Sequence, residues 1–181
     1  MMFGSSRRSV LRGIGAGTAA LVGGAGVVSA APGRGPPSKG ETIVDVAVAN
    51  GFDVLVAAVQ EAGLVDALSG NRQLTVFAPT DAAFGELGVT ADNVGDVDFE
   101  AAVGATLTEI LTYHVTPGRR KAKSVTGASE LPTLNGAKID VSGTVLNDGQ
   151  AEIVQTNIPA SNGIVHVIDG EDVNGPGVLL P

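Results

Sequence analysis

The sequence predicts an α+β domain, with helices in the first half of the chain and strands in the second. Between Thr42 and Tyr113 apolar residues recur mostly at helical spacing, interrupted by one compact strand. From Val125 onward the pattern changes to short strands separated by the turn signals Asn135-Gly136, Asn147-Asp148-Gly149 and Asn162-Gly163. Helices followed by strands indicate segregated layers and not the alternating βα units of a parallel sheet.

A targeting segment precedes this domain. Residues 1–31 are interpreted as a twin-arginine signal peptide, because Arg7-Arg8 precede a Gly- and Ala-rich apolar stretch and small residues at a cleavage site after Ala30 or Ala31. A membrane anchor is the alternative, but the apolar stretch is short and interrupted by glycines, so we expect no membrane span once the signal is removed. Residues 32–40, rich in Pro and Gly, are a predicted linker, and residues 41–181 form the domain.

The first helices are marked by a cap and by turn residues. Thr42 and the acid three residues later, Asp45, have the form of a capping box, which predicts a helix that ends at Asn50-Gly51. Helical spacing then predicts a second helix up to Gly63 and a short third one over 64–68.

The next elements lead to a Tyr-His pair. A mostly apolar strand over 74–78 ends at Pro79, and Thr80 stands where a helix N-cap would. Asp98 is expected to cap one longer helix, running through Gly104 and ending at Tyr113-His114. Its apolar face would consist of Phe99, Val103, Leu107, Ile110 and Leu111.

Composition and charge exclude several classes of function. Aromatic residues make up 3% of the chain and Trp is absent, which argues against a platform for stacking bases or sugars. The formal net charge is −8 and all nineteen acids follow the leader, so nucleic acid is not an expected partner. The basic run 119–123 is interpreted as a solvated loop, and the acidic surface suggests a halophilic source. Cysteine is absent, so no disulfide is possible.

Three ordered motifs carry a family resemblance. Residues 75–84 (TVFAPTDAAF) resemble the first signature of fasciclin domains, and residues 163–169 (GIVHVID) resemble the second. Tyr113-His114 resembles the tyrosine-histidine motif of the same family. The likeness extends over about residues 41–181 and implies a wedge of about seven strands with several packed helices, acting in adhesion at the cell surface or in the matrix. One departure is the segment 170–177, which stands between the second signature and the terminal Val-Leu-Leu-Pro.

The motif residues divide into a structural group and a candidate binding group. A structural role is expected for Thr75, Phe77, Pro79, Thr80, Asp81, Phe84, Gly163, His166 and Asp169. In this group Asp81 is expected to accept a hydrogen bond from a histidine or a backbone amide. The resemblance implies receptor contact for Ile110, Leu111, Tyr113, His114 and Val115, whereas the alternative is that these residues only finish the helix against the sheet.

Enzyme and cofactor motifs are missing from the sequence. It contains no Cys nucleophile, no Gly-x-Ser-x-Gly elbow and no His-Glu-x-x-His, and two histidines cannot form a three-His zinc site. An EF-hand register from Asp169 would place Val173 and Leu180 at ligand positions, so calcium is not expected either. We therefore expect no catalytic activity, no metal and no cofactor.

The function that these observations predict is non-covalent binding outside the cell, to another surface protein, to a glycan, or to a further copy of the chain. The alternative is an extracellular carrier of a small ligand or metal, with a pocket lined by Tyr113, His114 and Asp81. A hydrolase is a third and weaker alternative. Adhesion predicts an exposed apolar or acidic patch, and a carrier predicts one such pocket.

Overall fold

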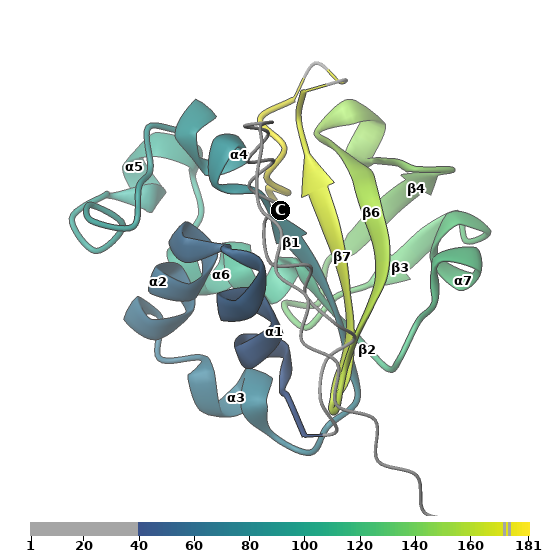
Figure 1. Ribbon diagram of the computed structural model, residues 1–181. Helices are drawn as coiled ribbons and strands as arrows, with labels where there is room; N and C mark the ends of the chain where they lie inside the picture. Colours follow the sequence, from purple (N-terminus) through teal and green to yellow (C-terminus); the bar gives the residue numbers. More distant parts are fainter. Residues whose placement is uncertain (1–39, 172, 174) are drawn as a thin grey trace, which may run out of the picture. The chain divides into compact units, whose positions relative to one another are not determined.

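The computed structural model describes residues 40–171, 173 and 175–181, which fall within one compact unit of the chain. It confirms the predicted α+β class, with most of the helices on one side of a seven-stranded sheet (Figure 1). The predicted leader and most of the linker, residues 1–39, lie outside the described residues. The helices are α1 (Ile43–Asn50), α2 (Asp53–Glu61), α3 (Val65–Ser69), α4 (Asp81–Glu86), α5 (Phe99–Val103), α6 (Leu107–Tyr113) and α7 (Ala122–Thr126).

The strands form one sheet in the order β2-β1-β7-β6-β5-β4-β3. Neighbouring strands are antiparallel except for the parallel pair β1–β7. The Leu134 amide, just after β3, donates to the Val115 carbonyl of β2 at 2.8 Å, so the two ends of the sheet meet. The strands are β1 (Leu74–Pro79), β2 (Val115–Pro117), β3 (Glu130–Pro132), β4 (Lys138–Ser142), β5 (Val145–Leu146), β6 (Ala151–Ala160) and β7 (Gly163–Asp169).

Strands β1 and β7 separate two apolar cores. In β1, Leu74, Val76 and Ala78 pack into the core under helices α1 to α6, whereas Phe77 packs into a second core on the other side. This alternation follows from the two-residue period of a strand. Both faces are apolar, so β1 is buried along its full length.

The long helix predicted from Asp98 to Tyr113 is wrong, because two helices replace it. Gly104 adopts φ 78°, a left-handed conformation that ends α5, and α6 starts three residues later at Leu107. Thr106 caps α6 in a reciprocal box with Glu109. A glycine in a left-handed conformation ends a helix. A hydroxyl residue that follows it, with an acid three residues further on, then caps the start of the next helix.

The region around Val125 also departs from the prediction of strands. Residues 122–126 form α7, and Val125 at its centre is fully buried in the second core. Helix α7 has no side-chain cap, so the sequence carried no start signal for it. The three predicted turns do lie between or beside strands, at 135–136, 147–149 and 162–163.

The C-terminal segment after β7 is buried without forming a strand. Val178 and Leu179 are both fully buried. The Gly177 amide donates to the Gln150 carbonyl at 2.9 Å, and a Cβ on Gly177 would lie 2.3 Å from the backbone nitrogen of Gly170. Gly170 and Gly177 can therefore approach each other closely, because neither carries a side chain. No helix within the described residues combines the length and apolar character that crossing a bilayer requires.

Candidate functional site

The two signature segments lie side by side as the parallel pair β1–β7. Their register runs from Leu74 opposite Gly163 to Pro79 opposite Ile168. The pair is closed at its end by Thr80, whose hydroxyl donates to the Asp169 carboxylate at 2.8 Å. Glycine is required at 163, because a Cβ there would lie 2.2 Å from the Leu74 carbonyl oxygen.

The remaining first-signature residues hold the segments that follow β1 and β2 in place. The Thr75 hydroxyl donates to the Gly118 carbonyl at 2.7 Å and accepts from an amide in the same loop. Thr80 caps α4 through the Ala83 amide, and Phe84 is buried below that cap. The Asp81 carboxylate accepts from the Val54 amide at 3.1 Å, so its partner is a backbone amide and not a histidine.

His166 lies in the second core, stacked on Phe77 with ring centroids 5.8 Å apart. Its Nε2 is 3.0 Å from the Arg120 carbonyl oxygen, and its Nδ1 accepts from the Asn157 amide at 3.4 Å. Both ring nitrogens therefore contact backbone groups. These contacts fit the neutral tautomer, in which Nε2 carries the proton and donates while Nδ1 accepts. Burial lowers the pKa of this imidazole, against a smaller opposing effect from the Arg120 carbonyl.

Tyr113 extends from the end of α6 toward β4. Its hydroxyl donates to the Lys138 carbonyl at 2.8 Å and accepts from Asn147 Nδ2 at 2.9 Å. Burial raises the pKa of the phenol. The ring is 4% exposed and belongs to the second core.

His114 lies on the opposite side of the sheet end, where it connects α6 to the C-terminal segment. Its Nδ1 is 2.7 Å from the Ile110 carbonyl oxygen, and its Nε2 accepts from the Leu179 amide at 3.0 Å. The side chain is 1% exposed. Burial lowers the pKa of His114 to about 4, so the ring is neutral at neutral pH.

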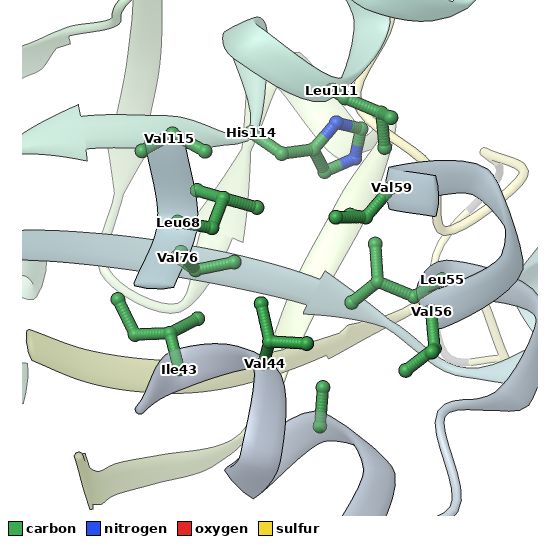
Figure 2. Close-up of a pocket in the computed structure, with 11 residues that line it drawn as sticks. Ile43, Val44, Leu55, Val56, Val59, Leu68, Val76, Leu111, His114 and Val115 are labelled. Atoms are coloured by element: carbon green, nitrogen blue, oxygen red, sulfur yellow. The ribbon is translucent and has the colours of Figure 1, made fainter. Parts of the chain in front are cut away.

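A small apolar crevice lies beside His114 (Figure 2). It has space for about 20 Å³, which is close to the minimum for one water molecule. Figure 2 shows His114 at one end of the crevice and the half-buried Val44 and Val56 at the other. Its lining consists of Ile43, Val44, Ala47, Leu55, Val56, Val59, Leu68, Val76, Leu111, His114 and Val115.

The five predicted binding residues are therefore placed in the interior. Each is at most 4% exposed, from Ile110 at 1% to Tyr113 at 4%. Leu111, His114 and Val115 form part of the crevice lining, whereas Ile110 and Tyr113 do not. The crevice therefore gives access to Leu111, His114 and Val115 but not to Ile110 or Tyr113.

The pocket that the carrier alternative requires is not formed. Tyr113 contacts β4, Asp81 binds the start of α2, and only His114 lines the crevice. Tyr113 and His114 diverge because successive residues at the end of α6 point to different sides of the sheet. Asp81 lies on another helix, α4. Among the described residues, no group of three or more His, Cys, Asp or Glu side chains is arranged to hold a metal ion.

Asn162 is a central buried residue that the sequence suggested only as part of a turn. Its Oδ1 accepts from the Ile43 amide at 2.9 Å, and its Nδ2 donates to the carbonyls of Leu68 and Gly70 at 2.6 and 2.9 Å. One side chain thus joins the start of α1, the end of α3 and the start of β7. Gln150 has a similar role for the C-terminus, since its Oε1 accepts from Leu180.

The comparisons with known proteins agree with this arrangement. The model of the fasciclin domain family matches residues 50–170. Protein sll1483 of Synechocystis sp. is 40% identical over 131 residues, covering 71% of each chain. Immunogenic protein MPB70 of Mycobacterium bovis is 36% identical over 123 residues, covering 67% of this chain and 56% of that protein. A domain pair of the insect cell adhesion molecule Fasciclin I has a similar fold, with a TM-score of 0.53 and 19% identity over 77% of this chain and 53% of that one.

Proposed function

Because the chain belongs to the fasciclin domain family, we propose that it is an exported, non-catalytic binding module that adheres to a surface protein or glycan outside the cell. The leader over residues 1–31 supports export by the twin-arginine route and an extracellular or cell-surface location. The acidic composition supports a salt-rich exterior.

The observation that carries the proposal is an apolar surface on α1 and α2, beside the crevice. Val48 is 56% exposed and follows Val44 by four residues, so the two share one face of α1. Val44 and Val56 of α2 are half-buried and line the crevice. We call Val44, Val48 and Val56 the α1–α2 apolar surface, and we propose that a partner inserts an apolar side chain there, with Leu111, His114 and Val115 beneath it.

The engagement of the two histidines supports a non-catalytic role. Both are buried, and both use their ring nitrogens for backbone hydrogen bonds. A general acid or base must form a hydrogen bond to the substrate, and the ring nitrogens of both histidines are already used in backbone contacts. The carrier alternative receives no such support, because the crevice has space for little more than one water molecule.

Adhesion can be tested with beads that carry the mature domain, incubated with intact cells of the source organism in their native salt. Val48→Asp places a charge on the α1–α2 apolar surface, and we expect it to reduce bead attachment at least tenfold. The matched control is Val154→Asp, because Val154 is 52% exposed on β6, away from α1 and α2. Equal attachment by both variants, each with an unchanged circular dichroism spectrum, would refute the assignment of this surface.

A further inference from the structure

Four basic residues form a ridge between β2 and α7. Arg119, Lys121 and Lys123 are exposed and Arg120 is half-buried, and we call these four residues the basic ridge. Lys138 pairs with Glu130 at 2.6 Å. It is the only basic residue in residues 40–171, 173 and 175–181 with a carboxylate oxygen within 4.0 Å. Four clustered cations, none with a described carboxylate oxygen within 4.0 Å, are unexpected in a chain with nineteen acids.

The basic ridge is held by contacts to three strands, β1, β6 and β7. The Arg120 amide donates to Thr75 of β1, and its carbonyl oxygen is 3.0 Å from His166 Nε2 of β7. The Ala122 amide donates to Asn157 Oδ1 of β6 at 2.8 Å, and the Arg119 guanidinium donates to the Ala160 carbonyl at 3.0 Å. The ridge thus presents its charges from an ordered backbone, which reduces the entropy lost on binding.

The acidic residues gather in the other part of the molecule. Residues 41–113 contain twelve Asp and Glu side chains and one basic residue, Arg72. Part of this segment lines a shallow groove of about 330 Å³ between the end of α2 and the α5–α6 junction. Glu61, Asp98 and Glu100 line that groove and are all exposed, and we call it the acidic groove.

We propose that the basic ridge of one copy binds the acidic groove of a second copy. Figure 1 shows α5, beside the groove, and α7, which carries Lys123 of the ridge, on opposite sides of the molecule. The basic ridge of one copy therefore cannot bind the acidic groove of the same copy. Two different surfaces meet in this contact, so it is heterologous and extends into open chains of molecules instead of closing into a two-fold dimer.

The net charge makes this association dependent on salt. Copies of the mature domain repel at long range, because removing the three arginines of the leader changes the net charge from −8 to −11, whereas the ridge and the groove attract only at contact. At about 0.1 M salt the screening length is about 10 Å, which suppresses the repulsion more than the contact pairs. At about 1 M it falls to about 3 Å, and we expect the oligomers to dissociate, so the contact would form in dilute surroundings and be released in the salt-rich exterior proposed above.

Sedimentation velocity of the mature domain at both salt concentrations tests the proposal. We expect concentration-dependent oligomers at about 0.1 M for the wild type, and monomers for the ridge variant Lys121→Glu/Lys123→Glu and for the groove variant Glu61→Lys/Glu100→Lys. The groove control is Asp66→Lys/Glu171→Lys, which changes the net charge equally at exposed acids outside the groove and is expected to keep the oligomers. Circular dichroism establishes that each variant is folded at both salt concentrations.

Mixing the two reversed variants gives a sharper result. The ridge variant keeps a native groove and the groove variant keeps a native ridge, so an equimolar mixture is expected to regain oligomers that neither forms alone. Monomers in the mixture, or monomeric wild type that instead binds a soluble polyanion through the ridge, would overturn the proposal. Val48→Asp is expected to associate like the wild type, which separates this contact from the α1–α2 apolar surface.

Discussion

His114 is enclosed between two backbone groups, the carbonyl of Ile110 and the amide of Leu179. Its pKa of about 4 in the folded protein lies below the ordinary value of 6.5. The unfolded chain therefore binds more protons between these two pH values, and stability falls as pH drops from about 6.5 to about 4. Below that window the loss from this one group is about 3 kcal/mol.

Urea unfolding at pH 7, 5 and 4 measures this dependence. His114→Gln keeps an acceptor for the Leu179 amide but cannot be protonated, so we expect a lower stability at pH 7 and a much weaker decline toward pH 4. The control is His166→Gln. The pKa of His166 is also lowered by burial, so this variant measures how much of the decline comes from the other buried histidine. If the decline of the wild type persists fully in the His114 variant, His114 is not the residue responsible.

The chemical type of a residue was easier to predict from the sequence than its partner. Asp81 was expected to accept from a histidine or a backbone amide, and the amide belongs to Val54, 27 residues earlier. Asn162 contacts Ile43, 119 residues earlier, and nothing local to Asn162 distinguishes it from an ordinary turn asparagine. Such contacts depend on the tertiary packing of distant segments, which local patterns do not encode.

At the scale of elements, Gly104 and Gly85 offer a test with opposite signs. Gly104 ends α5 at φ 78°, so Gly104→Ala is expected to destabilise the protein by about 1 kcal/mol. Gly85 lies inside α4, and a Cβ there meets no atom within 4 Å. Gly85→Ala is therefore expected to stabilise the protein by about 0.5–1 kcal/mol. Thermal unfolding of both variants checks these values. If Gly104→Ala stabilised the protein, the result would contradict the helix end at Gly104 and support one continuous helix from Asp98 to Tyr113.

The starts of α1 and α4 were predicted from a capping side chain, whereas α2 and α3, which have no such cap, were predicted from apolar spacing. The Thr42 box and the Thr80 cap are both present, so α1 and α4 begin where expected. Helix α7 was missed because Lys121 at its N-cap makes no side-chain hydrogen bond. The break at Gly104 was missed because a glycine inside an amphipathic pattern resembles a tolerated defect until its φ is known.

The order of the strands is a property of the whole molecule, and composition and periodicity could not supply it. They predicted the α+β class, and the family resemblance supplied the number of strands. The insertion of β7 between β1 and β6 depends on pairing between segments far apart in the chain. The burial of the C-terminus after the segment 170–177 was equally inaccessible, because Gln150 and His114 hold it from elsewhere in the fold.

The C-terminal segment is expected to contribute strongly to global stability. Leu179 is fully buried in the second core, so Leu179→Ala should cost about 3 kcal/mol. Its neighbour Leu180 is half-buried and provides the matched control, for which we expect a loss of less than about 1.5 kcal/mol. Chemical denaturation of both variants gives the comparison, and equal losses would contradict the buried position of Leu179.

The parallel pairing of β1 with β7 also constrains when the domain can fold. Leu74 pairs with Gly163, so the partner of β1 is made long after β1 itself. A nascent chain that has completed its helices still exposes the sheet-facing side of β1 and has only part of the second core. Contacts of such long sequence separation close large loops and slow the search for the native state. The domain is thus expected to complete its fold only after β7 has emerged from the ribosome.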